Sequence, residues 1–538
     1  MPMLSWYNRD IDLTRSSLAP YRLLEPIQSL SRGEEDSPNM LIEGDNLDAL
    51  KALLPYYSGQ VKCIYADPPF NTGQAFDDYD DNLEHSIWLS ILYPSLELQR
   101  ELLSEDGTIF IHIDDNELGY LIAIADEIFQ RKNRIAIVTF KQGAATGHKS
   151  INPGLVSTTN FIVVYAKNKS KWKPNRLFTG RARDKRYNRF LLNPDAPHQE
   201  WKFATLSSAF VKYMDKSLKE LKSEYGDQLE DILNTFVIDH SRQVIRLARP
   251  DYNAVGEDAK KYIDASLASP KDIFKLERAN HSDMYFLAGE RIIFYSGKLK
   301  EIDGELVAGE PLTTLWDDLL SNNLHKEGHV SLPKSKKPEG LVKRCLELVT
   351  HPQDLVLDCF LGSGTTAAVA HKMNRRWIGI ERGEHARSKC QVRLAKVVEG
   401  EDSGISKSVG WKGGGGFQFF KLGNSIFDDE GRIQKGVRFK DLAAHIWFAE
   451  TGAPRSTRAK TEAFLGVHNE IGYYLLFNGI LGDLSKSGGN VLTKRILKCL
   501  PKFNGPKVIY GEANDLPEEL MSELDITFKQ TPYDIKAR

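Results

Sequence analysis

An acid, two prolines and an aromatic residue follow a short apolar segment of the chain. The segment 61–66 is rich in β-branched and apolar residues, which predicts a buried strand, and Asp67-Pro68-Pro69-Phe70 comes directly after it. Because proline fixes its own φ and cannot continue a central strand, we expect Asp67 and Phe70 on a stiff turn at the strand's carboxyl end. Open α/β sheets bind their ligands there. A carboxylate, backbone carbonyls and a flat ring suit the binding of an amino group on a planar heterocycle, although Asp-Pro-Pro alone is also common in ordinary turns.

A second stretch, residues 355–367, combines a predicted strand, a glycine turn and an alanine-rich helix. Gly362 and Gly364 let the backbone approach a ligand, and the amino end of the helix favours a negative group. The next predicted strand, 376–380, ends at Glu381, where a carboxylate can accept both hydroxyls of a ribose. The pattern predicts a nucleoside cofactor and fits a nicotinamide dinucleotide too. The chain has no GxxxxGK[ST] motif, which argues against a phosphate-loop NTPase.

Three features favour S-adenosylmethionine as the cofactor. Phe360 stands where its ring could pack on the cofactor, and Thr365 and Thr366 offer hydroxyls to an amino-acid carboxylate. The chain also contains the Asp67 turn, which an NAD-dependent oxidoreductase does not need. The two stretches together are a stronger signal than either one alone.

The Asp67 turn predicts a mechanism for methylating an exocyclic amine, whose lone pair is delocalised into the ring. We expect Asp67 and the Pro68 carbonyl to accept hydrogen bonds from the two amine hydrogens, which frees the lone pair for attack on a sulfonium methyl group. Positioning and electrostatics would provide the acceleration without a covalent enzyme intermediate. The base must leave the duplex, and Phe70 is expected to stack on it while Asn71 lines the same pocket.

These residues resemble a known family, the β-ordered amino-DNA methyltransferases, in which Asp-Pro-Pro-Phe precedes a Phe-x-Gly-x-Gly cofactor turn and a target-recognition region lies between them. The resemblance covers roughly residues 38–400 and is greatest to the modification subunits of type III restriction-modification systems. Further motifs that carry it are Glu43-Gly44-Asp45-Asn46-Leu47, the segment 107–115 and the segment 528–535. Asp rather than Ser before the prolines is similar to the adenine-N6 members; cytosine-N4 methylation is the alternative.

The resemblance implies roles for further residues. It places Asp45 on the adenine of the cofactor, although a helix cap would equally explain that residue. It also places Glu381 on the ribose, Asp358 with Gly362 and Gly364 beneath the methionine, and Thr365 and Thr366 on its carboxylate. The implied partners are double-stranded DNA, a second copy of the chain and a restriction subunit with helicase and nuclease activity. Lys336 and Lys337 are expected to be surface charges, and no metal site is expected, since Asp114-Asp115 has no identifiable third ligand.

A basic stretch follows the catalytic motifs, from about residue 167 to 189. Aromatic residues are interleaved with it: Trp172, Phe178, Tyr187 and Phe190. Such a stretch can track phosphates and contact bases, or it can be a solvated linker. The predicted DNA-binding residues are Lys171, Arg176, Arg181, Arg183 and Arg186.

The elements that must position these residues alternate between strand and helix. Strands are predicted at 107–113, 135–140 and 160–166, with helices at 87–103 and 117–129. This alternation predicts an α/β fold, and the resemblance specifies it as a Rossmann-like methyltransferase sheet with circularly permuted motif order. A helix over 47–54, capped by Asn46 and ended by Pro55, is also expected. The predicted domains are an N-terminal segment (1–37), the catalytic half (38–166), a target-recognition region (167–285), the cofactor-binding half (286–412) and a small C-terminal α/β domain (413–538), which begins at a tetraglycine hinge or tight loop.

Composition narrows the class of protein. The 538 residues carry a net charge of −2, so affinity for nucleic acid would have to come from local patches. The five cysteines are scattered without a CxxC pair, and no segment predicts a signal peptide or a membrane span, so we expect a cytoplasmic protein. Two readings from other classes remain open at this stage: an NAD-dependent oxidoreductase and a non-catalytic DNA-binding subunit.

Overall fold

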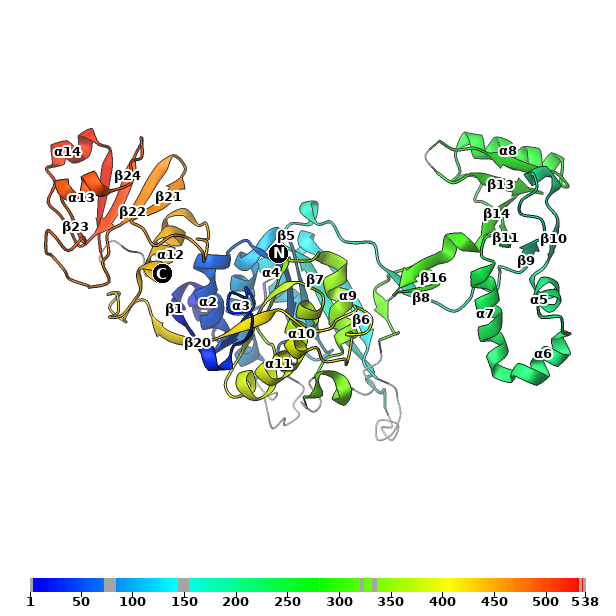
Figure 1. Cartoon of the computed structure of the whole chain (residues 1–538), viewed down its shortest axis with the longest axis horizontal. Helices are drawn as coiled ribbons and strands as arrows, with labels where there is room; N and C mark the ends of the chain where they lie inside the picture. Colours follow the sequence, from blue (N-terminus) through cyan, green and yellow to red (C-terminus); the bar gives the residue numbers. More distant parts are fainter. Residues whose placement is uncertain are drawn as a thin grey trace. The chain divides into compact units, whose positions relative to one another are not determined.

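The computed structural model describes residues 3–71, 84–143, 154–279, 281–302, 304–319, 324–330, 336–531 and 535. Its contacts divide the chain into two compact units (Figure 1). Unit 1 contains residues 1–175 and 313–538, and unit 2 contains residues 176–312.

Unit 1 is built on an eleven-stranded mixed sheet with the order β1-β20-β3-β19-β18-β4-β5-β7-β6-β17, and β2 pairs with β20. Its strands are β1 (Arg22–Pro26), β2 (Arg32–Gly33), β3 (Met40–Glu43), β4 (Val61–Ala66), β5 (Leu103–Ile113), β6 (Arg134–Lys141), β7 (Thr159–Ala166), β17 (Leu315–Trp316), β18 (Leu355–Asp358), β19 (Arg376–Glu381) and β20 (Gly416–Ser425). The neighbours β3, β19, β18, β4 and β5 are all parallel, whereas β7 is antiparallel to β5 and β6. The strand β18 therefore lies beside β4, although many other elements separate the two in sequence.

The helices that pack around the eleven-stranded sheet form two groups. The first contains α1 (Arg9–Leu18), α2 (Asn46–Tyr57), α3 (His85–Leu102), α4 (Leu118–Phe129) and α12 (Phe439–Thr451); the second contains α9 (Glu339–Val349), α10 (Thr365–Lys372) and α11 (Val392–Glu399). Trp88, Leu92 and Leu96 recur at helical spacing on α3, and all three are buried in the main core. This periodic apolar face explains why the segment forms a helix and where it packs. The predicted strands and helices between residues 87 and 166 agree with α3, β5, α4, β6 and β7.

The first turn of α2 differs from the expectation. Asp45, not Asn46, caps this helix: its carboxylate Oδ1 accepts from the N–H groups of Leu47 and Asp48 at 3.0 and 3.4 Å. Pro55 does not end the helix either, because α2 continues to Tyr57. Proline removes one backbone hydrogen bond, and the burial of the apolar residues around it offsets that loss.

The tetraglycine stretch is a tight loop in close contact with neighbouring backbone, and the strand after it completes the main sheet. Gly413 and Gly414 have φ values of +96° and +114°, and a Cβ on Gly413 would lie 3.0 Å from the backbone of Gly400. The following strand β20 pairs in parallel with β3 and antiparallel with β1. Because Phe417 and Phe419 of β20 are fully buried, this part of the predicted C-terminal domain contributes to the core of the large sheet.

The remaining C-terminal residues form a smaller α/β layer with its own core. Three parallel strands and one antiparallel edge strand give the order β21-β22-β24-β26. The elements here are β21 (Phe464–His468), β22 (Ile471–Leu475), β23 (Val491–Leu492), α13 (Lys494–Cys499), β24 (Lys507–Gly511), β25 (Ala513–Asn514), α14 (Glu518–Glu523) and β26 (Ile526–Gln530). Tyr474, Leu476, Leu492 and Ile509 are buried between them.

Unit 2 has a different architecture, an antiparallel six-stranded sheet with the order β10-β9-β11-β14-β13-β12 beside the three-stranded sheet β15-β16-β8. Its elements are β8 (Phe178–Gly180), β9 (Arg189–Leu191), β10 (Phe203–Thr205), α5 (Leu206–Met214), α6 (Leu218–Tyr225), α7 (Leu229–Asp239), β11 (Val244–Ala248), α8 (Glu257–Ala268), β12 (Ile273–Leu276), β13 (Met284–Leu287), β14 (Glu290–Phe294), β15 (Leu299–Ile302) and β16 (Glu305–Pro311). The compact unit begins at Arg176 and ends at Leu312, later at both ends than the region 167–285 expected from the sequence.

None of the helices in the described part of the chain is both long and apolar enough to cross a membrane.

Candidate active site

The Asp67 turn lies at the carboxyl end of β4, beside the carboxyl end of β18. The register pairs Cys63 with Val356 and Ile64 with Leu357. Asp67, directly after β4, and Asp358, the last residue of β18, therefore lie at neighbouring strand ends at one edge of the sheet. The turn itself is held by α3, because the Trp88 indole N–H donates to the Pro69 carbonyl at 2.8 Å.

A lysine lies against the two side chains of this turn, Asp67 and Phe70. Lys337 Nζ lies 2.8 Å from Asp67 Oδ2 and 4.5 Å from the centroid of the Phe70 ring. Lys337 precedes α9, which packs on β4 and β5 and so carries the lysine to the sheet edge. Both Lys336, 7% exposed, and Lys337, with a side chain 12% exposed, are mostly buried, so the expectation of surface charges was wrong.

A buried histidine that the sequence analysis did not single out packs against the Asp67 turn. His112 of β5 is fully buried, its Nδ1 atom is 2.9 Å from the Tyr65 hydroxyl, and its Nε2 atom is 3.2 Å from Asn160 Nδ2. The His112 ring lies 5.3 Å from the Phe70 ring, and Nδ1 lies 4.0 Å from Asp67 Oδ1. Burial, and then the nearby Lys337 charge, holds the His112 pKa well below its usual value, so the ring is neutral. The available sequence signal was a lone polar ring in an otherwise apolar strand.

The two carboxyl groups at the strand ends are electrostatically linked. Burial raises the pKa of Asp67, and the charge and hydrogen bond of Lys337 oppose that rise. Burial raises the pKa of Asp358 to about 7, with Thr366 and the Phe360 N–H acting against it and the Asp67 and Glu381 charges adding to it. A carboxylate at either strand end thus makes a second one more costly, which favours a cationic or hydrogen-bond-donating ligand between them.

The glycine turn after β18 is closed by two of the predicted carboxylates. Asp358 Oδ1 accepts from the Phe360 N–H at 2.9 Å, and Glu381 Oε2 accepts from the Gly362 N–H at 2.6 Å. Gly362 and Gly364 have φ values of +58° and +80°, a region in which residues with a Cβ are strained. The structure thus brings Asp358, Phe360, Gly362, Gly364 and Glu381 together at the ends of β18 and β19.

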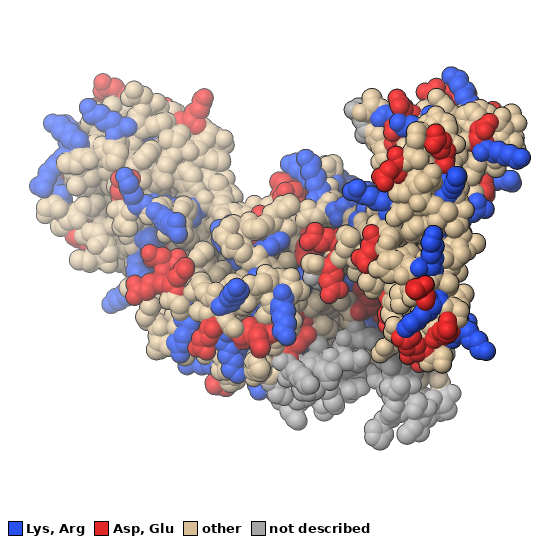
Figure 2. Space-filling model, turned by 45° about the vertical axis from the view of Figure 1, so that its right-hand side comes forward, with Lys and Arg blue, Asp and Glu red and all other residues tan. Residues whose placement is uncertain are grey.

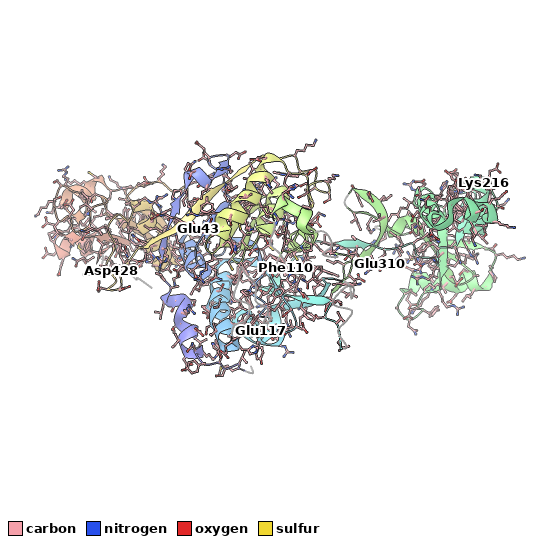
Figure 3. All side chains as sticks on the ribbon, turned by 90° about the horizontal axis from the view of Figure 1, so that it is seen from below. Glu43, Phe110, Glu117, Lys216, Glu310 and Asp428 are labelled. Carbon is pink, nitrogen blue, oxygen red and sulfur yellow. The ribbon has the colours of Figure 1, made fainter. Side chains whose placement is uncertain are left out.

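Asn71 adopts a left-handed backbone conformation at the end of the Asp67 turn, with φ +60°. Its side-chain amide donates to Glu117 Oε1 at 2.6 Å, and His85 Nδ1 lies 2.6 Å from the same oxygen. Glu117, labelled in Figure 3, is fully buried at the start of α4. Sequence reasoning did not assign this carboxylate a role.

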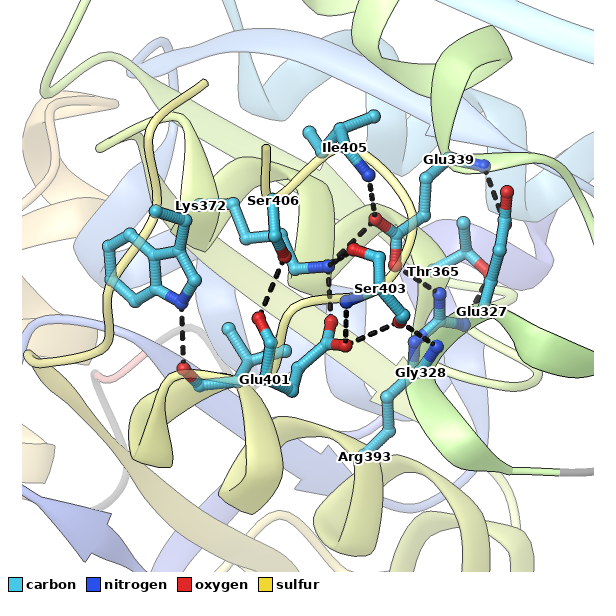
Figure 4. Close-up of polar contacts among 12 residues, drawn as sticks. Glu327, Gly328, Glu339, Thr365, Lys372, Arg393, Glu401, Ser403, Ile405 and Ser406 are labelled. Carbon is cyan, nitrogen blue, oxygen red and sulfur yellow. Dashed lines mark hydrogen bonds and ion pairs between the residues drawn. The ribbon is translucent and has the colours of Figure 1, made fainter. Parts of the chain in front are cut away.

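Behind the glycine turn, a buried ion-pair network joins α9, α10 and α11 (Figure 4). Glu339 pairs with Arg393 at 2.7 Å and with Lys372 at 2.8 Å, and all three side chains are fully buried. Lys372 also pairs with Glu401. Arg393 continues to Thr365 Oγ1 at 2.7 Å, which ties the network to the first residue of α10.

The predicted DNA-binding residues lie in both units. Lys171, in unit 1, is 3.2 Å from Glu105; in unit 2, Arg183 pairs with Glu230 at 2.9 Å and Arg186 with Asp184 at 2.7 Å. Arg181 is 3.8 Å from Glu310, and the Arg176 guanidinium lies 5.3 Å from the Phe178 ring centroid. On the face that Figure 2 shows, Lys and Arg side chains of unit 2 are mixed with Asp and Glu.

Two of the interleaved aromatic residues are not at the surface. Tyr187 and Phe190 are 1% and 7% exposed and belong to the core of unit 2, with Phe236 stacked on Phe190 at a centroid distance of 5.7 Å. They cannot serve as base-stacking platforms without unfolding, so their assignment to a DNA-contacting surface is corrected. On β9 itself Arg189 is exposed, whereas Phe190 and Leu191 are buried. In the described ranges, no group of three or more His, Cys, Asp or Glu residues could hold a metal ion.

The profile of the DNA methylase family matches residues 61–391, a range that contains both the Asp67 turn and the glycine turn. The chain therefore belongs to the N6/N4 DNA methylase family, which decides against an NAD-dependent oxidoreductase.

Among its relatives are Mod subunits of type III restriction-modification enzymes. It is 35% identical over 528 residues to the EcoPI Mod subunit of Escherichia phage P1, covering 87% of this chain and 73% of that one. It is 34% identical over 430 residues to the "Probable type III restriction-modification enzyme HindVI Mod subunit" of Haemophilus influenzae, covering 74% of this chain. The chain spans only 56% of that relative's length. Among solved structures, the cytosine-N4-specific PvuII DNA methyltransferase aligns over 70% of this chain and 93% of its own, with 13% identity and a TM-score of 0.32.

Proposed function

We propose that the protein transfers a methyl group from S-adenosylmethionine to the N6 amine of adenine in DNA, as a modification subunit of a restriction-modification system. The observation that carries this proposal is the adjacency of β4 and β18, which places Asp67 and Asp358 at neighbouring strand ends. An acceptor for an amine and a cofactor turn then share one edge of the sheet. Membership in the N6/N4 DNA methylase family supports the same chemistry. Because the Asp67 turn precedes the glycine turn in the chain, we further propose a circularly permuted motif order.

The residues at the end of β18 fit S-adenosylmethionine, whose sulfonium supplies a transferable methyl group. Glu381 would hold the ribose hydroxyls, and Phe360, half-buried beside the core, would pack on the cofactor. Both cap bonds of Asp45 use Oδ1, so we assign its Oδ2 to the amino group of the cofactor's adenine. Asp358, Gly362 and Gly364 would lie beneath the methionine, and Thr365 and Thr366 would hold its carboxylate.

Asp67 and the Pro68 carbonyl would accept the two hydrogens of the target amine, with Phe70 stacked on the flipped base. Two acceptors draw the nitrogen toward tetrahedral geometry and leave its lone pair aimed at the methyl group. After transfer, the excess proton would pass from the nitrogen to the Asp67 carboxylate, which already accepts a hydrogen bond from it. Pro69, whose carbonyl is fixed by Trp88, keeps the turn rigid, and Asn71 would line the pocket.

We assign DNA recognition to the inserted region that includes unit 2, with Lys171, Arg176, Arg181, Arg183 and Arg186 as candidate contacts. We propose the five domains expected from the sequence with two changes: β20 is assigned to the methyltransferase sheet, and the compact part of the inserted region is unit 2. A homodimer and a restriction subunit are the proposed protein partners, since the relatives named above are Mod subunits.

The test is to express the wild-type chain and an Asp67→Ala variant in a host without DNA methylation and to map modified bases by single-molecule sequencing. We expect N6-methyladenine at one sequence motif with the wild type and none with the variant, while the variant still binds DNA. N4-methylcytosine would establish the alternative base. Methylation that survives Asp67→Ala would overturn the mechanism, and DNA binding without methylation by the wild type would favour a non-catalytic subunit.

A further inference from the structure

The Lys337 ammonium occupies both contacts that the proposed function assigns to the target base. It donates to Asp67 Oδ2 at 2.8 Å, and it lies 4.5 Å from the centroid of the Phe70 ring. A base stacked on Phe70 with its amine on Asp67 would need the same space. The ammonium and the amine therefore compete for one position.

The other oxygen of Asp67 does not offer a second route. Oδ1 is buried, has no hydrogen-bond partner among the described residues, and faces the fully buried His112 at 4.0 Å. An amine that enters from the ligand side of the turn therefore reaches Oδ2, the oxygen that Lys337 holds.

We propose that Lys337 is a placeholder for the target amine: it holds Asp67 and covers Phe70 in the free protein, and it withdraws when the flipped base takes these two contacts. This inference rests on the proposed function and adds a positioning residue to it.

The chemistry of the reaction explains why a cation suits this position. As the methyl group bonds to the nitrogen, positive charge develops on the amine beside Asp67. The site thus has an acceptor and an aromatic face already arranged around a cationic nitrogen. Between turnovers, a buried carboxylate without a cation would take up a proton, because burial penalises its charged form. The charge and hydrogen bond of Lys337 favour the ionised form of Asp67 until a base arrives.

Among the described residues, the titratable groups that face Asp67 are Lys337 from the segment before α9, His112 from β5, Asp358 from β18 and Tyr65 from β4. Of these, only the lysine is both cationic and in hydrogen-bond contact with the carboxylate. Its withdrawal would leave Asp67 with a different pKa in the free protein and in the complex with DNA.

The experiment measures pH dependence in two regimes, with a duplex that carries the methylated motif. The second-order rate constant at limiting DNA reports ionisation in the free protein, and the single-turnover rate at saturating DNA reports ionisation in the complex. Both rates should fall at low pH as Asp67 takes up a proton, and we call this fall the acid limb. In the wild type we expect the acid limb of the single-turnover rate to lie at higher pH than that of the second-order constant, because Lys337 is withdrawn from Asp67 in the complex. In Lys337→Met the limb of the second-order constant should move up by about 1–3 pH units, while that of the single-turnover rate stays in place.

Two variants complete the design. Lys337→Arg keeps the charge and should retain the wild-type limb. Lys343→Met removes a partly buried pair with Glu347 within α9 and should change neither limb. Equal shifts of both limbs in Lys337→Met would mean that the lysine stays on Asp67 during the reaction, and no shift would mean that it does not act on Asp67; either result overturns the placeholder. A wild-type protein that does not methylate DNA would instead refute the proposed function.

Discussion

The Arg393 guanidinium donates to Thr365 Oγ1 at 2.7 Å, and the same Nη1 atom also lies 3.2 Å from Ser363 Oγ. A guanidinium can only donate, so both hydroxyls act as acceptors toward it and their own protons must point elsewhere. The two hydroxyls lie 3.1 Å apart, and one proton can bridge them. The other is then available to an acceptor such as a carboxylate. Arg393 thus sets the hydrogen-bond polarity of the turn proposed to hold the methionine.

Replacing Arg393 with methionine should weaken both cofactor binding and folding. The change leaves Glu339 paired with Lys372 alone in a buried site, and breaking such a pair typically costs about 3–5 kcal/mol. Calorimetry with S-adenosylmethionine and urea unfolding measure the two effects. Arg387→Met, which breaks an exposed pair with Glu43, is the matched control and should leave the free energy of unfolding nearly unchanged. Unchanged cofactor affinity in a folded Arg393→Met protein would refute the role of Arg393 in the turn.

The pKa of Asp358 predicts how stability depends on pH. Burial raises the pKa of Asp358 to about 7 in the folded protein, against 3.8 in the unfolded chain. The folded chain therefore binds the proton more tightly. The stabilising contribution is complete below pH 3.8 and is lost as pH rises through about 7; the loss approaches about 4 kcal/mol. In Asp358→Asn this fall in the free energy of unfolding should disappear, because the amide does not ionise. Urea unfolding across this range checks it, with Asp354→Asn at the other end of the strand as the control that keeps the wild-type slope.

His112 should act through the hydrogen bonds beneath the Asp67 turn. His112→Phe leaves the Tyr65 hydroxyl and the Asn160 amide without their ring partner, which should lower stability by about 1–3 kcal/mol. Adding Tyr65→Phe should recover part of that loss, because it removes the hydroxyl that was left without a hydrogen-bond partner. We also expect slower methylation with unchanged cofactor affinity. A double-mutant cycle from urea unfolding measures the coupling; strictly additive effects would show that Tyr65 and His112 do not interact.

Two arginines of unit 2 should separate DNA contact from structure. If Arg176 contacts a phosphate, Arg176→Ala should lower the slope of log affinity against log salt by about 0.9 without affecting folding. Arg183, also a candidate contact, has a side chain only 8% exposed and pairs with Glu230, so Arg183→Ala should destabilise unit 2 in addition to weakening DNA binding. Salt-dependent DNA binding and thermal melting measure these outcomes. An unchanged salt slope in Arg176→Ala removes that residue from the proposed interface.

Local sequence determined the elements that hold the site, because periodicity and turn chemistry act over a few residues. The strand before Asp67, the glycine turn after residue 358 and the strand ending at Glu381 all form where the sequence predicts them. Predictions failed where long-range packing competes with local preference. Pro55 does not end α2, because its neighbours are buried, and Tyr187 and Phe190 face the core of unit 2 despite their basic surroundings.

By itself, the sequence determined which chemical groups the site contains and that they belong to a methyltransferase-like pair of motifs. Only the tertiary structure decided which groups surround them. Lys337, His112 and Arg393 reach Asp67, Phe70 and Thr365 through the packing of α9 on the sheet, the pairing of β4 with β5 and the packing of α11 on α10. The physical reason is that a hydrogen bond or ion pair is set by distance in space. Spacing along the chain fixes that distance only for near neighbours, and these partners come from remote segments.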